Sequence, residues 1–434
     1  MKRINGYNAA KELLVRKPAF GMKPDGSAEE NSVESSVRAV LADVYENGDD
    51  AVRKYTKQFD GIELTSFEVT EEEVHAAFEK VDSGVISALE LAANRIREFH
   101  IACKKTANAS FIHQGVGRQI LPMKRAGIYV PGGTAVYPST VLMTAVPARV
   151  AGVEDVIITT PAQKDGNVPA ITLVAAAISN VNRIFKIGGA QAIAAMAFGT
   201  QTIPAVDKIC GPGNIYVATA KRMVYGTVDI DSIAGPSEVI VVADESASPV
   251  YCAADLIAQT EHDSMSSAIL ITTSSKIADA VEKEMKKQLT KLERRAIISK
   301  ALDANGVIAV VDTMDEAVDL VNLYAPEHLL LMMQNASSYM HRITATGCMF
   351  IGPESPVAIG DYIAGPSHVL PTGGSARFAS PLGIEDFMKV ISVVAFDEIR
   401  LKYFGDAVIR LAEAEGLTAH AQTIKIRLKN LKKN

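Results

Sequence analysis

The sequence predicts an α/β protein whose strands form parallel sheets. Three observations favour this fold class: short apolar runs alternate with helical patterns, glycine-rich turns follow several of the runs, and the alternation occurs in two series separated near Gly235-Pro236-Ser237. Repeated strand, turn and helix segments are typical of doubly wound sheets. We therefore expect two Rossmann-like layers that bind ligands at the carboxyl ends of their strands.

A mainly helical segment precedes the first series. Apolar residues recur at helical spacing over 33–44 and stop before Gly48, which suits the position after a helix C-terminus. Thr70 and Glu73 have the spacing of a capping box at the start of a second helix. A third helical run covers 85–104.

The strands of both series are expected at the apolar runs, with helices between them. Thr313 and Glu316 form a second capping-box pair before the last of these helices. The expected strands lie at 127–130, 156–159, 184–187 and 208–210 in the first series and at 239–243, 268–272 and 307–311 in the second.

The end of the chain has a different pattern. A helical pattern at 406–415 is followed by alternating apolar residues at Ile424, Ile426 and Leu428, which predict a strand. So small a segment cannot bury a core of its own. We expect it to pack on something else, such as a second chain.

Composition excludes several classes of protein. The chain has 434 residues, of which 48% are hydrophobic and 22% charged, with a net charge of 44 − 50 = −6. This excludes a disordered chain and disfavours nucleic acid as a partner. Four widely spaced cysteines indicate buried thiols in a reducing compartment, residues 1–17 lack the apolar core of a signal peptide, and no apolar stretch approaches the length of a membrane span. We expect a soluble, cytoplasmic protein.

Four polar residues in the second half of the chain have side chains suited to a metal site. Gln259 and His262 are three residues apart at the end of an expected helix, so they share one face. Asp361 lies in a loop rich in Gly and Pro, and His420 follows the last helical pattern. Together they would give zinc or a similar metal four N/O ligands. The alternative is a polar helix end and solvated loop residues.

Glu327 and His328 place an acid beside a base at the entrance of an apolar run. Histidine titrates near neutrality, so the pair could transfer protons. The alternative is a surface turn after Pro326. Two further segments, 360–368 and 415–420, combine an acid with a histidine, and each also reads as a solvated turn or helix end.

Glycine turns follow three expected strands, at 130–133, 188–191 and 211–214. They suit a dinucleotide bound in an unusual pose, or tight turns without a ligand. None is a complete GxGxxG, and the Walker motif GxxxxGK[ST] does not occur, which disfavours a Walker-type NTPase.

Eight motifs, taken together and in order, resemble the histidinol dehydrogenase family. They extend over about 127–420, and the lengths of chain on either side also fit. The motifs are VPGG at 130–133, GGAQA at 188–192, GPGN at 211–214, AGPSEV at 234–239, AQTEHD at 258–263, APEHL at 325–329, GDYIAGPSHVLPT at 360–372 and EGLTAH at 415–420.

The resemblance implies a homodimeric, zinc-containing enzyme that uses NAD to oxidise L-histidinol through L-histidinal to L-histidine, the last steps of histidine biosynthesis. Glu327 and His328 would be the acid–base pair, with His328 as general base and Glu327 activating water. The other roles carried over are zinc binding by Gln259, His262, Asp361 and the partner subunit's His420, substrate contact by Ser237, His368, Glu415, His328 and the metal ligands, and NAD binding by Tyr129, Gln191 and Asn214.

The resemblance also implies a domain plan of two Rossmann-like domains, the second inserted in the first, with small terminal segments that wrap around the partner. The expected pieces are an arm at 1–24, a first domain of 25–127 plus 236–380 with the metal and catalytic residues, a second domain at 128–235 contributing NAD-binding residues, and a tail at 381–434.

Two alternative functions remain open from the sequence. One is an NAD-dependent dehydrogenase of the same fold that acts on another small alcohol, such as a sulfonated diol. The other is a non-catalytic binding protein, which the intact Glu327-His328 pair disfavours because a binder needs no acid–base couple. The basic end at 425–433 could bind RNA, but a solvated segment explains it better.

Overall fold

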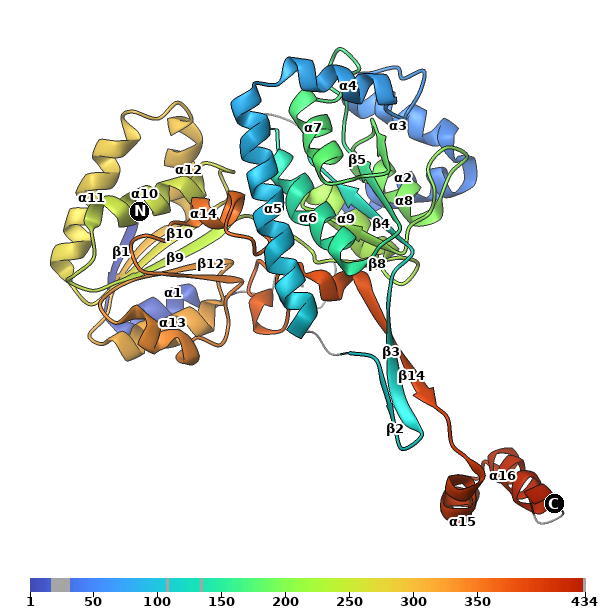
Figure 1. Ribbon diagram of the computed structural model, residues 1–434. Helices are drawn as coiled ribbons and strands as arrows, with labels where there is room; N and C mark the ends of the chain where they lie inside the picture. The colour runs from blue at the N-terminus through green and yellow to red at the C-terminus, as the bar shows by residue number, and fades with distance from the viewer. Residues whose placement is uncertain (17–31, 107–108, 133–135, 432–434) are drawn as a thin grey trace. The chain divides into compact units, whose positions relative to one another are not determined.

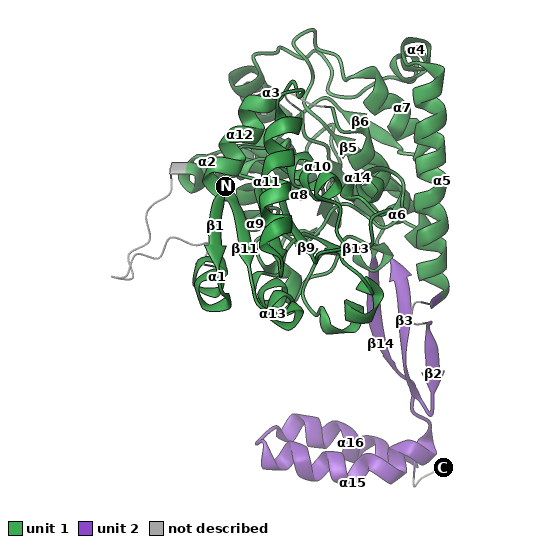
Figure 2. Cartoon of the chain, turned by 90° about the vertical axis from the view of Figure 1, so that its left-hand side faces the viewer, with its two compact units in different colours: residues 1–105, 123–387 green, residues 106–122, 388–434 purple. Residues whose placement is uncertain are grey.

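The computed structural model describes residues 1–16, 32–106, 109–132 and 136–431 (Figure 1). Contacts divide the chain into two compact units (Figure 2). Unit 1 comprises Met1–Lys105 and Met123–Phe387, and unit 2 comprises Thr106–Pro122 and Met388–Asn434. Part of the expected arm at 1–24, and Gly133 of the first glycine turn, lie outside the described residues.

Unit 1 contains a six-stranded, wholly parallel sheet in the order β1-β11-β10-β9-β12-β13. The second to fourth strands in this order lie where the second series predicts them. The strands are β1 (Lys2–Asn5), β9 (Glu238–Ala243), β10 (Ser267–Thr272), β11 (Gly306–Val310), β12 (His328–Met332) and β13 (Cys348–Ile351).

Helices cover both faces of this sheet (Figure 1). Because side chains alternate along a strand, Val239 and Val241 join one apolar cluster while Ile240 and Val242 join another. The first cluster includes residues of α10 (Pro249–Thr260), α11 (Ser275–Leu289) and α12 (Arg295–Asn305), and the second residues of α1 (Tyr7–Leu14) and α13 (Met314–Tyr324). Shorter helices follow at η1 (Ala336–Arg342), α14 (Val357–Tyr362), η2 (Ser375–Arg377) and η3 (Ile384–Phe387).

A second parallel sheet of five strands has the order β6-β5-β4-β7-β8. The first four of these strands in sequence match the first predicted series. They are β4 (Arg125–Tyr129), β5 (Asp155–Thr159), β6 (Arg183–Phe185), β7 (Lys208–Cys210) and β8 (Asp229–Ile230). The prediction of an α/β fold with parallel sheets is therefore confirmed.

The N-terminal helices pack differently from the expected domain plan, which grouped 25–127 with 236–380. Val37, Val44 and Val52 share an apolar cluster with Ile157 and Ile209 of the five-stranded sheet. The physical reason is shape: α8 is rich in alanine, so the apolar stripe of α2 can approach it closely. The helices around this sheet are α2 (Ser32–Asn47), α3 (Asp49–Asp60), α4 (Glu71–Lys80), α5 (Ser83–Thr106), α6 (Pro138–Ala151), α7 (Ala170–Ile178), α8 (Gly189–Phe198) and α9 (Ile215–Val224).

Unit 2 contains an antiparallel sheet in the order β14-β3-β2 and two helices. The predicted strand at 424–428 is wrong, because this segment is helical. Ala421, Ile424 and Leu428 are spaced by three and four residues, and Ile424 and Leu428 lie against Gly405 of the preceding helix. The elements are β2 (Phe111–His113), β3 (Val116–Pro122), β14 (Met388–Val394), α15 (Glu398–Ala414) and α16 (Thr418–Leu431).

The local signals in the sequence are found in the structure. Thr70 and Thr313 both form capping boxes, and Gly48 follows α2 with a positive φ. All four cysteines lie within the described ranges and none is in a disulfide, and Cys210 and Cys252 are fully buried. Among the described helices, none combines the length and apolar character needed to cross a bilayer.

Candidate active site

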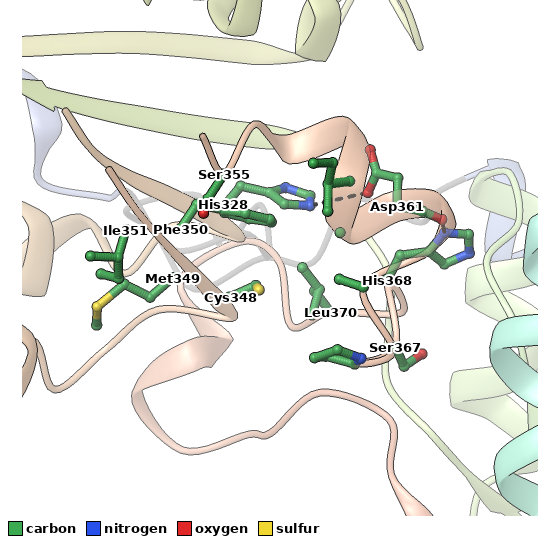
Figure 3. A pocket seen from close by; sticks show the side chains of 14 residues that line it. His328, Cys348, Met349, Phe350, Ile351, Ser355, Asp361, Ser367, His368 and Leu370 are labelled. Atoms are coloured by element: carbon green, nitrogen blue, oxygen red, sulfur yellow. Dashed lines mark hydrogen bonds and ion pairs between the residues drawn. The ribbon is translucent and has the colours of Figure 1, made fainter. Parts of the chain in front are cut away.

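A small cavity of about 280 Å³ lies in unit 1 beside the first residues of β12 and β13 (Figure 3). We call it the small cavity. The sequence predicts ligands at carboxyl strand ends, whereas Glu327 and His328 lie at the amino end of β12 in this sheet. The small cavity is lined by His328, Cys348, Met349, Phe350, Ile351, Ser355, Ile359, Gly360, Asp361, Ala364, Pro366, Ser367, His368 and Leu370.

His328 is the first residue of β12, and its ring is held at Nδ1. Its Nδ1 lies 3.3 Å from the carbonyl oxygen of Glu238 and 3.4 Å from Oε2 of Glu327. Both neighbours are acceptors, so Nδ1 carries the proton in the neutral ring. The lone pair is then on Nε2, which is buried, has no hydrogen-bond partner among the described residues, and faces Asp361 Oδ1 at 3.6 Å (Figure 3).

Glu327 is buried beside this ring, with 7% of its surface exposed. Its Oε2 accepts a hydrogen bond of 2.9 Å from the backbone N–H of Glu238, and Gln259 Nε2 lies 3.5 Å from the same oxygen. One carboxylate oxygen is thus fixed by the protein. The Glu327–His328 pair is therefore a buried, oriented acid–base couple and not a surface turn.

Charges around the pair alter its ionisation. Burial lowers the pKa of His328, but the charges of Glu327 and Asp361 raise it by more than this. The resulting pKa is about 10, above the ordinary value of histidine. Burial raises the pKa of Asp361, whereas the charge of His328 lowers it and leaves it below its ordinary value. Any cation added beside Asp361 would oppose the attraction that keeps His328 protonated.

Three of the four predicted metal ligands lie in unit 1. Gln259 is buried in the last turn of α10, and His262 is exposed on the turn that follows. Asp361 lies in α14, and the charge of His262 also lowers the pKa of Asp361. His420 lies exposed on α16 of unit 2. Among the described residues, no three His, Cys, Asp or Glu side chains gather closely enough to hold a metal.

The remaining predicted substrate contacts divide between the two units. Ser237 is partly exposed just before β9. His368 lines the small cavity, with Nδ1 2.9 Å from the carbonyl oxygen of Asp361 and Nε2 3.4 Å from Thr140 Oγ1. Glu415 is exposed at the C-terminal end of α15 in unit 2.

The three residues predicted to bind NAD all line a second cavity of unit 1, of about 1050 Å³. We call it the large cavity. Tyr129 ends β4, Gln191 lies in the first turn of α8, and Asn214 precedes α9. For these residues of the five-stranded sheet, the predicted position at the carboxyl strand ends is correct. Gln191 is fully buried, and both polar atoms of its amide lack a partner among the described residues.

The N-terminus of α8 opens on the large cavity without a side-chain cap. Gly189 has a φ of +66°, a conformation that favours glycine, and its N–H donates to the Tyr129 hydroxyl at 3.1 Å. By contrast, the side chain of Asn214 caps α9, accepting from two backbone N–H groups. An uncapped helix N-terminus favours an anionic group such as a pyrophosphate.

Sequence reasoning missed three residues of these sites. Glu238 holds both members of the pair through its backbone, and its only signal is an acid directly before an apolar run. Arg16 binds the Glu238 carboxylate across 222 residues, and no local pattern indicates this. Asp60 lines the large cavity with a buried Oδ2 that has no partner among the described residues.

Two parallel sheets with helices on both faces, a buried acid–base pair and a large cavity at the strand ends define an α/β enzyme. The family model for histidinol dehydrogenase matches residues 24–428. The chain therefore belongs to the histidinol dehydrogenase family, and it is an oxidoreductase.

Individual relatives agree over nearly the full length. The histidinol dehydrogenase of Clostridium acetobutylicum is 49% identical over 94% of this chain and 95% of its own. That of Dehalococcoides mccartyi strain CBDB1 is 47% identical over 99% and 100%. The crystal structure of histidinol dehydrogenase from Elizabethkingia anophelis, 37% identical, has a TM-score of 0.92 and covers 100% of this chain and 99% of that one.

Proposed function

We propose that this enzyme oxidises L-histidinol through L-histidinal to L-histidine in histidine biosynthesis, with NAD as the electron acceptor. Family membership over the whole chain supports this substrate. The observation that carries the chemistry is His328: its Nδ1 is fixed between two acceptors, while Nε2 beside the small cavity forms no hydrogen bond with the described residues and faces Asp361 Oδ1 at 3.6 Å. A dehydrogenase of sulfonated diols is not favoured, because the matched relatives are histidinol dehydrogenases.

The residues present suit a zinc ion. Gln259, His262 and Asp361 would hold it together with the partner subunit's His420, a set of oxygen and nitrogen donors with one anion. His328 Nε2, which faces Asp361 and makes no hydrogen bond to any described residue, supports a polar ligand at this place. When bound, zinc would hold the imidazole and amino group of the substrate in position, and NAD would accept hydride.

The first oxidation needs a base for the hydroxyl proton. In its neutral form, His328 takes this proton at Nε2 while the carbon-bound hydrogen leaves as hydride, so the alcohol loses two electrons and becomes the aldehyde. The carbonyl of Glu238 and the carboxylate of Glu327 stabilise the imidazolium that forms, since both face Nδ1. Ser237, His368 and Glu415 hold the substrate.

The second oxidation needs water. Glu327 has one oxygen fixed by the N–H of Glu238, which leaves the other to take a proton from water as it adds to the aldehyde. The hydrate then loses hydride and one hydroxyl proton to give the carboxylic acid, which releases its remaining proton to water and becomes the carboxylate. His328 is again the base for the hydroxyl proton.

The large cavity suits a dinucleotide. The buried amide of Gln191 offers one donor group and one acceptor group to a ligand, and the start of α8 offers N–H groups to a pyrophosphate. Tyr129 and Asn214 complete this NAD site. The size of the cavity, about 1050 Å³, is sufficient for such a ligand.

The fourth zinc ligand requires a second chain in this proposal. The enzyme would be a cytoplasmic homodimer, and the tail at 381–434 would pack on the partner and supply His420 and Glu415. The two parallel sheets would serve as the catalytic and NAD-binding halves, the five-stranded one inserted in the sequence between β1 and β9.

The test is NADH formation by the purified enzyme with L-histidinol, with a sulfonated propanediol as the comparison, before and after treatment with a chelator. We expect NADH formation with histidinol and none with the diol. Activity with histidinol should be lost after chelation and should recover when zinc is added. Turnover of the diol without turnover of histidinol would overturn the proposed substrate.

A further inference from the structure

Arg16 contacts two segments that are distant in sequence: the start of β9, and the end of α13, which leads into β12, the neighbour of β9 in the six-stranded sheet. It follows α1 and its guanidinium donates from Nη1 and Nη2 to the two carboxylate oxygens of Glu238, at 2.7 and 2.6 Å. Its Nε donates to the carbonyl oxygen of Tyr324 at 2.7 Å, and the guanidinium lies 3.9 Å from the centre of the Tyr324 ring. The guanidinium of Arg16 thus donates hydrogen bonds in its plane and stacks its flat face on an aromatic ring.

Both segments hold the acid–base pair. Glu238 begins β9, and its N–H and carbonyl oxygen bind the side chains of Glu327 and His328 respectively. Tyr324 ends α13 and lies three residues before Glu327. A displacement of Glu238 would therefore move partners of both side chains, and a displacement of Tyr324 would move the backbone that carries them.

The turn between Tyr324 and Glu327 needs such support. Ala325 has a φ of +51°, an uncommon conformation for a residue with a side chain, and the following Pro326 removes a backbone donor. The Tyr324 hydroxyl is 2.8 Å from Ser267 Oγ, which fixes the other end of the same residue. The surrounding contacts, Arg16 among them, hold this turn in place.

The position of Arg16 is specific. A Cβ at Gly374 would lie 2.7 Å from Arg16 Cδ, so a glycine there leaves room for the side chain. Glu238 is 6% exposed, and a carboxylate so buried is costly without its cation. A bidentate pair plus a carbonyl contact cannot be reproduced by lysine, which has a single nitrogen.

We propose that Arg16 is a positioning residue for the reaction: by holding Glu238 and Tyr324 together, it sets the orientation of the Glu327–His328 pair. The inference rests on the proposed function in that the pair is taken to perform proton transfer. Arg16 itself does not contact the small cavity and reacts with nothing.

The first test compares Arg16→Met with Arg342→Met. Like Arg16, Arg342 pairs with an acid, Asp315 at 2.7 Å, and packs on a tyrosine, Tyr339, but no contact joins it to Glu238 or Tyr324 among the described residues. We expect Arg16→Met to lower kcat for histidinol by roughly 10- to 100-fold, as a small misplacement of reacting groups does, with KM for NAD changed less than about twofold. Arg342→Met should leave both constants within about twofold. A kcat for Arg16→Met equal to that of the control would overturn the proposal.

A double variant separates positioning from stability. In Arg16→Met the Glu238 carboxylate is buried without a cation, so the melting temperature should fall. Arg16→Met with Glu238→Met removes that charge and should recover much of the melting temperature, while kcat stays low because Arg16 no longer holds Tyr324. Arg16→Lys should recover stability more than kcat. Recovery of kcat in parallel with the melting temperature would show that Arg16 only neutralises a charge.

A third measurement is independent of activity. Hydrogen exchange of peptides that cover 324–332 should be faster in Arg16→Met and unchanged in Arg342→Met. If histidinol is not a substrate but exchange rises in this segment, the proposed function fails while the structural role of Arg16 stands. If histidinol is oxidised normally by Arg16→Met and exchange is unchanged, the positioning role fails alone.

Discussion

Replacing His328 with asparagine removes the proposed base with little disturbance of its surroundings. The Asn side-chain nitrogen can take the place of Nδ1 and donate to the carbonyl oxygen of Glu238, which lies 3.3 Å from Nδ1 in the structure. What is lost is Nε2, the ring nitrogen beside the small cavity that has no hydrogen bond among the described residues. The substitution therefore isolates the proton-accepting atom.

The expected loss follows from the chemistry of that atom. A positioned general base contributes roughly 10²- to 10⁴-fold to the rate, so kcat for histidinol should fall by this factor, equal to about 3–5 kcal/mol of barrier. Zinc content should change little, because the predicted ligands Gln259, His262 and Asp361 are intact. KM for NAD should also stay near the wild-type value, since the predicted NAD-binding residues line a different cavity.

The assay is NADH formation with saturating histidinol, together with metal analysis of the same preparation. An Arg342→Met enzyme prepared in parallel controls for general effects of substitution. Turnover near the wild-type rate in His328→Asn, at normal zinc content, would remove His328 from the mechanism. Loss of zinc together with activity would assign the residue to metal binding instead.

Three further predictions concern water activation, the second subunit and pH. Glu327→Gln should slow oxidation of histidinal more than oxidation of histidinol, because only the aldehyde step needs activated water; equal losses in separate assays of the two substrates would contradict this role. His420→Asn should lower the zinc content, and an equal mixture with His328→Asn should recover about one quarter of wild-type activity, since half of the randomly mixed dimers would have one intact site. No recovery after mixing would place all ligands of a site on one chain. His100, 1% exposed with no partner for either ring nitrogen among the described residues, has its pKa lowered to about 4 by burial. Since this lies below the unfolded value of about 6.5, its contribution to stability is complete above pH 6.5 and is lost as pH falls toward about 4, by up to about 3 kcal/mol. Urea unfolding of the wild type and His100→Leu at both ends of this range checks it, and equal acid sensitivity of the two would refute it.

Much of the fold could be predicted because buried parallel strands have a strong sequence signal. The runs Val239–Ala243 and Ala268–Ile271 are apolar throughout, since both faces of the six-stranded sheet are covered by helices. The edge strand β1 escaped prediction because Lys2–Asn5 is mostly polar and pairs on one side only. The tail was misread because Ile424, Ile426 and Leu428 fit a period of two as well as part of a helical stripe.

The residues of the site could be named because they occur in ordered motifs, but their support could not. Arg16 and Glu238 are 222 residues apart in the sequence. They meet only because β1 and α1 join a sheet whose remaining strands all lie after residue 237. The placement of the small cavity at the amino strand ends also depends on how α10 and α13 return along the sheet. Local patterns carry no information about either feature.

The account depends most on two successive oxidations at the Glu327–His328 pair. The direct measurement is an end-point reaction of the wild-type enzyme with a limiting, known amount of L-histidinol and excess NAD, scoring NADH and L-histidine. The account predicts two NADH and one L-histidine for each histidinol consumed. A single NADH with accumulation of the aldehyde, or no NADH at all, would contradict it.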